Sequence, residues 1–255
     1  MKALGIDVGG SGIKGAIVDT TNGAFLSDRV RIPTPSGMPP ESMLGTILDL
    51  RGKLGWEAGP IGVGFPGVIR GQTIRTSANL DDRLVGFALA KDLADACGDP
   101  VCLFNDADAA GFAEMRLGAG TPYAGRGTVL LLTIGTGIGT VLFRNGHLVP
   151  NLELGHVEFK GGDAEAYVSE RARKKGEMSW KRWGKRFDLF LAYLDRLLLP
   201  DLIILGGGGV KKPEKFEAYL SRDLPFVFAR FGNRAGIIGA AIAAGDLAAG
   251  TAELP

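Results

Sequence analysis

The sequence predicts a duplicated α/β fold, in which the two halves of the chain repeat one arrangement of strands and helices. The first observation is a glycine-rich turn at residues 9–12, which joins two strand-like runs within residues 3–19. The second is a similar turn at residues 135–137, again between two β-branched runs. In each half a β-meander is followed by alternating strands and helices, which is typical of mixed α/β domains. The two turns suggest phosphate-binding hairpins that face one another across a cleft.

The composition is that of an ordinary globular protein. Hydrophobic residues make up 45% of the 255 residues and charged residues 22%, so disorder is not expected. The formal net charge of +1 argues against a protein that binds nucleic acid over its whole surface. The two cysteines, Cys97 and Cys102, form no C-x-x-C pair, and every apolar run is too short or too interrupted to span a bilayer. With no signal peptide before the first strand, we expect a soluble, cytoplasmic protein that binds neither nucleic acid nor membranes.

Hydrophobic periodicity and turn residues predict the elements of the first half. The expected strands are a hairpin within 3–19, a strand at 24–32, strands at 61–65 and 101–104, and a small hairpin at 68–74. The expected helices cover 41–54, 87–97 and, opened by Asn105 and Asp106, a stretch that ends at Leu117.

The second half repeats this scheme. The expected strands are 127–134, 138–144, 147–149, 202–205 and 225–228, and the expected helices are near 163–174, 179–198, 213–220 and about 236–248. We expect a small N-terminal domain of residues 1–104 completed by the C-terminal helix at about 236–255. Residues 105–235 are expected to form the larger C-terminal domain.

The first glycine turn has three competing interpretations. Gly10-x-Gly12-x-x-Gly15 matches the dinucleotide fingerprint, but that motif needs a helix after the turn, and residues 13–19 favour a strand. A P-loop fails because no G-x-x-x-x-G-K-[ST] is present. One glycine turn alone is equally well explained as a tight hairpin. Two such turns, with hydroxyl residues Ser11 and Thr136, favour phosphate binding.

Taken together and in order, the motifs resemble those of a known family. Three of them are similar to the sugar kinases of the actin/hexokinase superfamily: Asp7-x-Gly9-Gly10-x-x-x-Lys14, Asn105-Asp106 and Gly135-Thr136-Gly137-x-Gly139. Two more resemble the ROK (repressor, open reading frame, kinase) family: Glu153-Leu154-Gly155-His156 and Gly206-Gly207-Gly208. The resemblance runs from residue 3 to about 245. It implies a ribonuclease H-like, two-domain kinase fold with a central cleft, a requirement for Mg²⁺ and a homodimer.

The resemblance also implies a set of site residues. Asp106 is the implied general base, although either Asp106 or Asn105 also suits the simpler role of a helix cap. The implied sugar-binding residues are Gly67, Asn79, Asn105, Glu153, His156 and Glu165. The implied donor-binding residues are Asp7, Gly9, Gly10, Ser11, Lys14, Thr133, Gly135, Thr136, Gly137, Gly207 and Gly208. Asp7 is further expected to orient the magnesium ion or its water.

One departure from the family pattern concerns zinc. Many ROK proteins follow this histidine with a cysteine cluster that, together with the histidine, binds structural zinc. Residues 157–170 contain no cysteine, and a zinc site needs about four ligands. The sequence therefore predicts no zinc, and His156 is expected to be free of metal.

Residues 171–186 form a basic run with an aromatic stripe. The cations are Arg171, Arg173, Lys174, Lys175, Lys181, Arg182, Lys185 and Arg186, against the single acid Glu177. Ser179 is the expected N-cap of a helix whose apolar face is Trp180, Trp183, Phe187, Phe190 or Leu191, and Leu194. The basic residues are either a solvated face or a track for a linear polyanion, which would bind by counterion release. Lys181, Lys185 and Arg186 are the expected donor contacts in the second case, which Lys211, Lys212 and Lys215 would extend.

The stretch Ser179-Trp180-Lys181-x-Trp183, with residues 199–208 beyond it, is similar to the polyphosphate-dependent glucokinases of the ROK family, the polyphosphate/ATP glucomannokinase subgroup. That resemblance implies phosphoryl transfer from polyphosphate, and from ATP, to the 6-hydroxyl of glucose, with mannose as a further acceptor. One alternative is an ATP-only ROK kinase for a hexose or an N-acetylhexosamine. The other is a non-catalytic sugar-binding or regulatory protein. A sugar-sensing repressor is disfavoured because the first turn begins too early for a DNA-binding module to precede it, and a non-catalytic sugar binder is disfavoured because Asp106 and both glycine turns are intact.

Overall fold

The computed structural model describes residues 1–34, 37–77 and 80–251, and the chain divides into two compact units. Unit 1 consists of Met1–Leu117 and Arg234–Pro255, and unit 2 of Gly118–Asn233. The expected division after residue 104 lies before helix α3 (Asp106–Leu117), whereas the compact units divide after this helix. The reason is that α3 packs along α7 (Ala235–Ala248), which belongs to unit 1.

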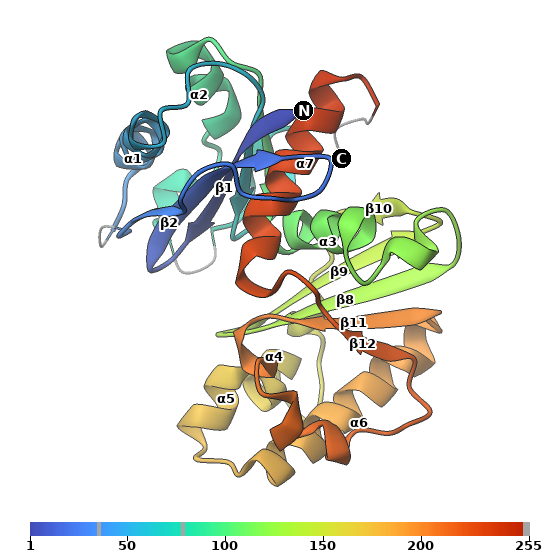
Figure 1. The fold of residues 1–255 in the computed structure, drawn as a ribbon. Helices are drawn as coiled ribbons and strands as arrows, with labels where there is room; N and C mark the ends of the chain where they lie inside the picture. Colours follow the sequence, from blue (N-terminus) through green and yellow to red (C-terminus); the bar gives the residue numbers. More distant parts are fainter. Residues whose placement is uncertain (35–36, 78–79, 252–255) are drawn as a thin grey trace. The chain divides into compact units, whose positions relative to one another are not determined.

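Unit 1 is built on a five-stranded sheet in the order β3-β2-β1-β4-β7 (Figure 1). Its strands are β1 (Lys2–Gly9), β2 (Gly12–Asp19), β3 (Val30–Ile32), β4 (Ile61–Phe65) and β7 (Val101–Asn105). The first three form an antiparallel meander, and β4 and β7 extend the sheet in parallel from β1. A small hairpin of β5 (Ile69–Arg70) and β6 (Thr73–Ile74) follows β4.

Helices cover both faces of this sheet (Figure 1). On one face lie α1 (Pro40–Lys53) and α2 (Leu89–Cys97), and α1 buries Met43, Ile47 and Leu50 along one side. On the other face lie α3 and α7. Helix α7 consists mostly of alanine, glycine and isoleucine and is buried around most of its circumference, because it packs against both the sheet and α3. The main hydrophobic core of unit 1 lies between its sheet and helices α1 and α2.

Unit 2 repeats the connectivity of unit 1 around a second five-stranded sheet, in the order β10-β9-β8-β11-β12. Its strands are β8 (Thr128–Ile134), β9 (Ile138–Arg144), β10 (His147–Val149), β11 (Leu202–Gly206) and β12 (Phe226–Phe228). Strands β8 to β10 are an antiparallel meander, and β11 and β12 add in parallel. The duplication predicted from the two glycine turns is therefore confirmed.

The helical layer of unit 2 contains α4 (Ala164–Val168), α5 (Glu170–Lys175) and α6 (Trp180–Leu198). The predicted cap of α6 is confirmed, because Ser179 Oγ accepts a hydrogen bond from the N–H of Arg182 at 3.2 Å. The predicted stripe of α6 is buried from Trp183 to Leu194, while Trp180 is half-buried. The indole N–H of Trp183 donates to the carbonyl of Val168 at 2.8 Å, which satisfies the polar atom of a fully buried ring. No helix in the described parts of the chain is long and apolar enough to cross a membrane.

Two helices expected in unit 2 differ in the structure. The expected helix near 163–174 is divided at Ser169, which has an extended backbone and caps α5 by accepting from the N–H of Ala172 at 3.1 Å. The expected helix at 213–220 consists of two 3-10 turns, Pro213–Lys215 and Glu217–Tyr219. Phe216 separates them with a φ of −138°, because its ring is fully buried in the core, 5.0 Å from the ring of Trp183.

The strand expected at 24–32 is also shorter in the structure, where it covers only Val30–Ile32. Phe25 makes a single isolated bridge with Val18. Between Phe25 and Val30 the chain is not part of a strand. Here the N–H of Ile17 donates to Ser27 Oγ and not to a backbone carbonyl of a neighbouring strand.

The close approach of α7 to the sheet generates a stability prediction. A Cβ atom added at Gly62 of β4 would overlap the carbonyl oxygen of Ala240 in α7. We expect Gly62→Ala to lower the free energy of unfolding by about 3 kcal/mol, because the helix must move away from the strand. Urea denaturation measures this change.

Gly45→Ala is the matched control, since Gly45 is exposed in α1 and a Cβ there would meet nothing within 4 Å. We expect this control to raise the free energy of unfolding by about 1 kcal/mol, because alanine favours a helix interior over glycine. If the two variants had equal stabilities, the packing of α7 on β4 would not be a constraint.

Candidate active site

The first glycine turn joins β1 to β2 through Gly10 and Ser11. Two side chains from the following segment hold its carbonyl groups: Arg31 donates to the carbonyl of Ser11 at 2.5 Å, and Thr34 Oγ1 donates to that of Gly9 at 2.6 Å. Among the described residues, the N–H groups of Gly10 and Ser11 have no hydrogen-bond acceptor. Successive unsatisfied N–H groups of this kind form an anion-binding turn.

A charged pair lies next to this turn. Asp7 of β1 and Lys14 of β2 are directly opposite in the sheet, and Lys14 Nζ donates to Asp7 Oδ2 at 3.0 Å. Their side chains are 22% and 27% exposed, so both are half-buried. Asp7 also adjoins the start of α7, since a Cβ at Gly236 would lie 3.6 Å from its carboxyl carbon. Asp7 and Lys14 therefore form one ion pair beside the turn, and their roles as donor contacts stay predictions.

Asn105 and Asp106 lie where β7 ends and α3 begins. Asn105 is buried, and its Oδ1 accepts from the N–H groups of Ala107 at 2.9 Å and Asp108 at 3.1 Å, so Asn105 is the helix cap. Its Nδ2 donates to the carbonyl of Gly67 at 3.1 Å, which joins two of the expected sugar-binding residues. Asp106 is half-buried at the first helical position, where the helix dipole stabilises negative charge.

The second glycine turn joins β8 to β9 through Gly135, Thr136 and Gly137. The N–H of Gly135 donates to the carbonyl of Gly137 at 2.9 Å and closes the turn. The carbonyl of Gly135 accepts from the N–H groups of Glu170 at 3.0 Å and Arg171 at 3.4 Å, so the start of α5 is bound to the turn. Within the parts of the chain that the structure describes, the N–H groups of Thr136 and Gly137 have no acceptor.

Glu165, in the first turn of α4, contacts the same loop. Its Oε2 accepts from the N–H of Ile138 at 3.3 Å. A Cβ at Gly137 would overlap this carboxylate oxygen, so glycine at position 137 leaves room for Glu165 against the loop. A residue expected to bind sugar thus also supports a turn expected to bind the donor.

The segment that carries Glu153 is held on β9 by one buried threonine. Thr140 is 1% exposed, and its Oγ1 donates to the carbonyl of Leu152 at 2.6 Å and accepts from the N–H of Leu154 at 3.0 Å. These two bonds fix the backbone on both sides of Glu153. The backbone that carries Glu153 is therefore held by the sheet.

Glu153, His156, Asp163 and Glu165 form an acid–histidine cluster in unit 2. His156 Nδ1 lies 3.2 Å from Asp163 Oδ2, and this hydrogen bond raises the pKa of His156 above its ordinary value. The charges of Glu165 and Glu153 act in the same direction, while partial burial opposes them. Desolvation raises the pKa of Glu153, with Glu165 adding to the rise and His156 opposing it. The cluster gathers several acceptors for hydroxyl groups around one imidazole.

The third glycine turn follows β11 at the same end of the sheet as the second turn. Gly206 pairs with Thr133 of β8, one residue before Ile134 and the turn. Gly207 adopts a φ of +86°, and Gly208 begins a short 3-10 turn, Gly208–Val210. Several residues expected to bind the donor therefore lie together at one edge of the sheet: Thr133, Gly135–Gly137, Gly207 and Gly208.

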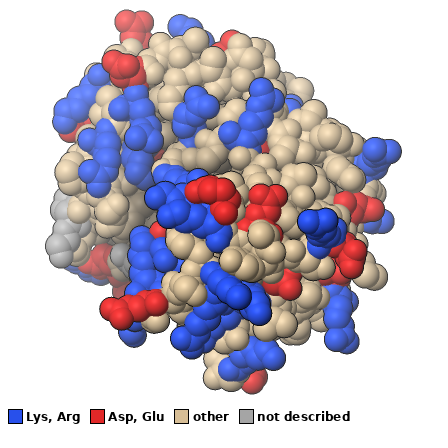
Figure 2. Space-filling view, turned by 60° about the horizontal axis from the view of Figure 1, so that its bottom comes forward, with Lys and Arg blue, Asp and Glu red and all other residues tan. Residues whose placement is uncertain are grey.

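The expected donor contacts on α6 have different surroundings. Lys181 and Lys185 are exposed, one helical turn apart. Arg186 is half-buried, with its guanidinium 4.2 Å from the ring centre of Tyr167 and a hydrogen bond to the carbonyl of Tyr167 at 3.3 Å. Arg186 therefore binds α6 to α4. Figure 2, which brings the helical layer of unit 2 forward, shows Lys and Arg side chains outnumbering Asp and Glu on this face.

The residues expected at the site are distributed over the two units. Unit 1 contains Asp7, Gly9, Gly10, Ser11, Lys14, Gly67, Asn105 and Asp106, and unit 2 contains the others; Asn79 lies outside the described residues. Sequence reasoning did not assign Thr140, Asp163 or Glu170 to the site. Asp163 stands at the N-cap position of α4, yet its side chain makes no capping bond and contacts His156 instead. Its place directly before a helix was the only signal in the sequence.

The described residues include no group of three or more His, Cys, Asp or Glu side chains placed to hold a metal ion. Magnesium does not require such a cage, because it is usually held by one or two carboxylates together with substrate phosphates. Asp7 supplies a carboxylate beside the first turn, so this donor set fits magnesium that arrives with a phosphate ligand. The lack of a structural zinc site stays a prediction.

The acid–histidine cluster generates a titration prediction. We expect Asp163→Asn to lower the pKa of His156 toward the ordinary value of about 6.5, because the charged hydrogen-bond partner is removed. In the native protein the pair stabilises the fold below the ordinary histidine pKa, and this contribution is lost as the pH rises through the raised pKa.

Proton NMR titration of the imidazole C–H signals measures the change. The chain has two histidines, and the signal of His147 in β10 serves as the internal reference. An unchanged His156 titration in Asp163→Asn would show that Asp163 does not control this proton.

Comparison with known proteins agrees with the geometry. The ROK family model matches residues 3–165. The chain is 42% identical to the polyphosphate glucokinase of Mycobacterium tuberculosis over 242 residues, which cover 94% of this chain and 90% of that protein. It is 41% identical to the polyphosphate glucokinase of Mycobacterium leprae over 244 residues, which cover 95% and 74% of the two chains.

Among solved structures, the inorganic polyphosphate/ATP-glucomannokinase from Arthrobacter sp. strain KM matches with a TM-score of 0.88 and 39% identity. The match covers 96% of this chain and 98% of that one. The actin/hexokinase-like α/β fold predicted from the sequence is thereby confirmed. The chain belongs to the ROK family.

Proposed function

We propose that the chain is a kinase that transfers a phosphoryl group from inorganic polyphosphate, and from ATP, to the 6-hydroxyl of glucose. The observation that carries this proposal is the match over nearly the whole chain to the Arthrobacter polyphosphate/ATP-glucomannokinase. The two glycine turns support the donor side of the reaction, and the acid–histidine cluster supports the sugar side. Mannose is proposed as a second acceptor, and the homodimer stays a prediction.

Each of the two turns offers N–H groups to donor phosphates. Gly10 and Ser11 offer these groups in unit 1, and Thr136 and Gly137 offer them in unit 2. Magnesium, held by the phosphates and Asp7, would neutralise charge on the transferred group. Because the carbonyls of Ser11, Gly9 and Gly135 are already bonded to protein donors, the turns keep their N–H groups in place for the anion.

Glucose is bound through acceptors and donors that match its hydroxyl groups. Glu153 and Glu165 accept hydrogen bonds, and protonated His156 donates one. Asn105 contributes the second N–H of its amide, since the first is bonded to Gly67. A site built from such groups rejects sugars that lack a hydroxyl, because its polar atoms would be left unpaired.

Asp106 is the general base. It accepts the proton of the 6-hydroxyl as the oxygen forms its bond to phosphorus, and the bond from phosphorus to the rest of the donor breaks. Asn105 caps α3 through the N–H groups of Ala107 and Asp108, and Asp106 Oδ1 also accepts from the N–H of Ala107 at 2.8 Å, so α3 keeps its cap when Asp106 acts as the base. The proposed reaction takes place in the cytoplasm, which fits the two free thiols, Cys97 and Cys102.

The role of Asp106 generates a kinetic prediction. We expect Asp106→Asn to lower kcat for glucose phosphorylation by about 100-fold or more, because the amide cannot accept the proton. Fold and glucose binding should persist, and circular dichroism and calorimetric titration with glucose measure them.

Asp95→Asn is the control, since Asp95 is an exposed acid on α2 that pairs with Lys91. It should react at the wild-type rate. A folded Asp106→Asn enzyme with near wild-type turnover would remove Asp106 from the mechanism.

The donor generates a second prediction. With polyphosphate as the only phosphoryl donor and no nucleotide present, we expect glucose 6-phosphate to form. The affinity for polyphosphate should fall with rising salt, and replacing Lys181 and Lys185 by alanine should reduce the salt slope by about 0.7 per lysine. Lys91→Ala, an exposed lysine of unit 1, is the matched control. Product formed only with ATP would overturn the polyphosphate assignment.

A further inference from the structure

A hollow on unit 2 lies beside the second glycine turn. It is lined by Thr136, Glu170, Arg171, Lys174 and Lys175. All five residues are polar or charged, and three cations outweigh one acid. The donor contacts named from the basic run, Lys181, Lys185 and Arg186, lie on α6, whereas the cations of this hollow come from the part of the same run that forms α5.

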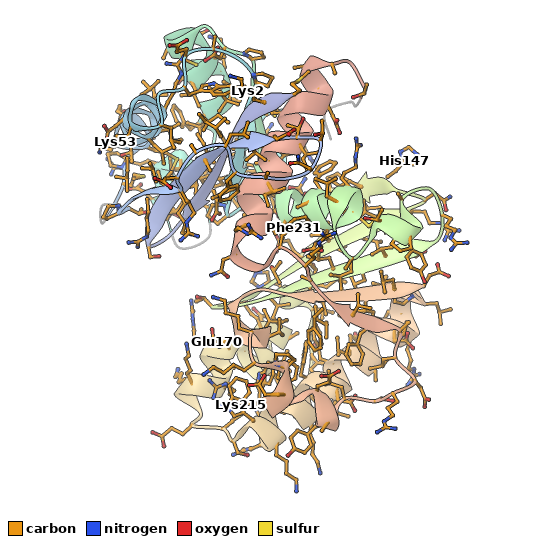
Figure 3. The ribbon with its side chains drawn as sticks, in the orientation of Figure 1. Lys2, Lys53, His147, Glu170, Lys215 and Phe231 are labelled. Atoms are coloured by element: carbon orange, nitrogen blue, oxygen red, sulfur yellow. The ribbon has the colours of Figure 1, made fainter. Side chains whose placement is uncertain are left out.

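The hollow is fixed relative to the turn by backbone hydrogen bonds. The carbonyl of Gly135 accepts from the N–H groups of Glu170 and Arg171, so two of the lining residues are bonded to the turn itself. Ser169 caps the same short helix through the N–H of Ala172. Figure 3 shows Glu170 where the helical layer of unit 2 approaches the strands. An anion bound at Thr136 would therefore meet this hollow next.

The opposite side of α5 is occupied by a different contact. The guanidinium of Arg173 lies 4.0 Å from the ring centre of Trp180, which binds α5 to α6. Arg171, Lys174 and Lys175 are left on the side of the hollow, and all three are exposed.

The charges in the hollow are only partly compensated. Lys174 Nζ pairs with Glu170 Oε1 at 2.9 Å. Arg171 and Lys175 form no ion pair with any residue that the structure describes. The hollow thus has two cations without an acidic partner, Arg171 and Lys175. The third, Lys174, could exchange Glu170 for a bound anion of higher charge.

We propose that this hollow is a subsite for the phosphates of a linear polyphosphate that follow those bound at the second turn. This inference rests on the proposed function and assigns part of its donor site. Each unit of an inorganic phosphate chain carries negative charge and acceptor oxygens, which arginine and lysine bind through charge-assisted hydrogen bonds. The lining includes no aromatic side chain on which a nucleobase could stack. The subsite therefore favours a phosphate chain over a nucleotide.

Direct binding measurements test the subsite without relying on catalysis. Inorganic tripolyphosphate and long-chain polyphosphate are titrated by calorimetry into the wild-type protein and into Arg171→Ala/Lys175→Ala at several salt concentrations. We expect the double variant to bind both about tenfold more weakly. The slope of log affinity against log salt should fall by about 0.7 for each cation removed. The KM for ATP should change little.

Arg196→Ala is the matched control, because Arg196 is an exposed arginine in the last turn of α6 and does not line the hollow. It should bind polyphosphate like the wild type. Circular dichroism and thermal unfolding verify that each variant is folded. We expect both of these variants to fold, because the changed residues are exposed.

Glu170→Gln tests the subsite in the opposite direction. Removing this negative charge and releasing Lys174 should strengthen polyphosphate binding. Weaker binding in Glu170→Gln would overturn the subsite, as would wild-type binding and salt slope in the double variant or an equal loss toward ATP.

The two proposals fail separately. A wild-type protein that binds polyphosphate through Arg171 and Lys175 but forms no glucose 6-phosphate would retain the subsite and overturn the function. A protein that forms glucose 6-phosphate from polyphosphate, with unchanged binding in the double variant, would retain the function and overturn the subsite.

Discussion

The packing of α7 against β1 and β4 is the contact on which unit 1 depends. Carbonyl groups of α7 approach the strands so closely that a Cβ at Gly5 would overlap the carbonyl oxygen of Ile237, and one at Gly62 that of Ala240. Backbones at this separation leave no room for larger side chains, and burial extends over most of the helix. Of the two strands supported in this way, β1 carries Asp7 and ends at the first turn, and β4 ends two residues before Gly67. The position of the charged pair and of the turn thus follows from a helix at the far end of the sequence.

A second constraint operates in unit 2, where a short loop has bonds to two functional regions. The carbonyl of Gly135 is bonded to the start of α5, and the N–H of Ile138 is bonded to Glu165 of α4. The loop that is proposed to bind donor phosphates therefore shares its backbone hydrogen bonds with a proposed sugar ligand. A shift of either helix would displace the turn, since tightly packed elements transmit small movements. In the proposed function, the sugar ligand Glu165 and the donor-binding turn are therefore linked through two peptide groups.

Local sequence patterns predicted those parts of the structure that local interactions determine. The glycine turns gave both hairpins, and the serine cap with its aromatic spacing gave α6. The expected helix at 213–220 was wrong because burial of Phe216 in the core of unit 2 outweighs helical spacing. The donor role expected for Arg186 did not anticipate its contact with Tyr167, and the bond between Asp163 and His156 joins residues on separate elements. Such contacts depend on the tertiary fold, which a spacing rule does not contain.

The path of the chain through the two units also bears on the order in which they are completed during synthesis. Unit 2 is one uninterrupted segment, whereas unit 1 consists of the beginning and the end of the chain. A nascent chain that ends at Asn233 has every strand and helix of unit 2 but lacks α7, the helix that covers β1 and β4. The sheet that carries the first turn then has only α3 on the face that α7 later covers. Although unit 1 begins the sequence, the middle of the chain is the first part that can finish folding.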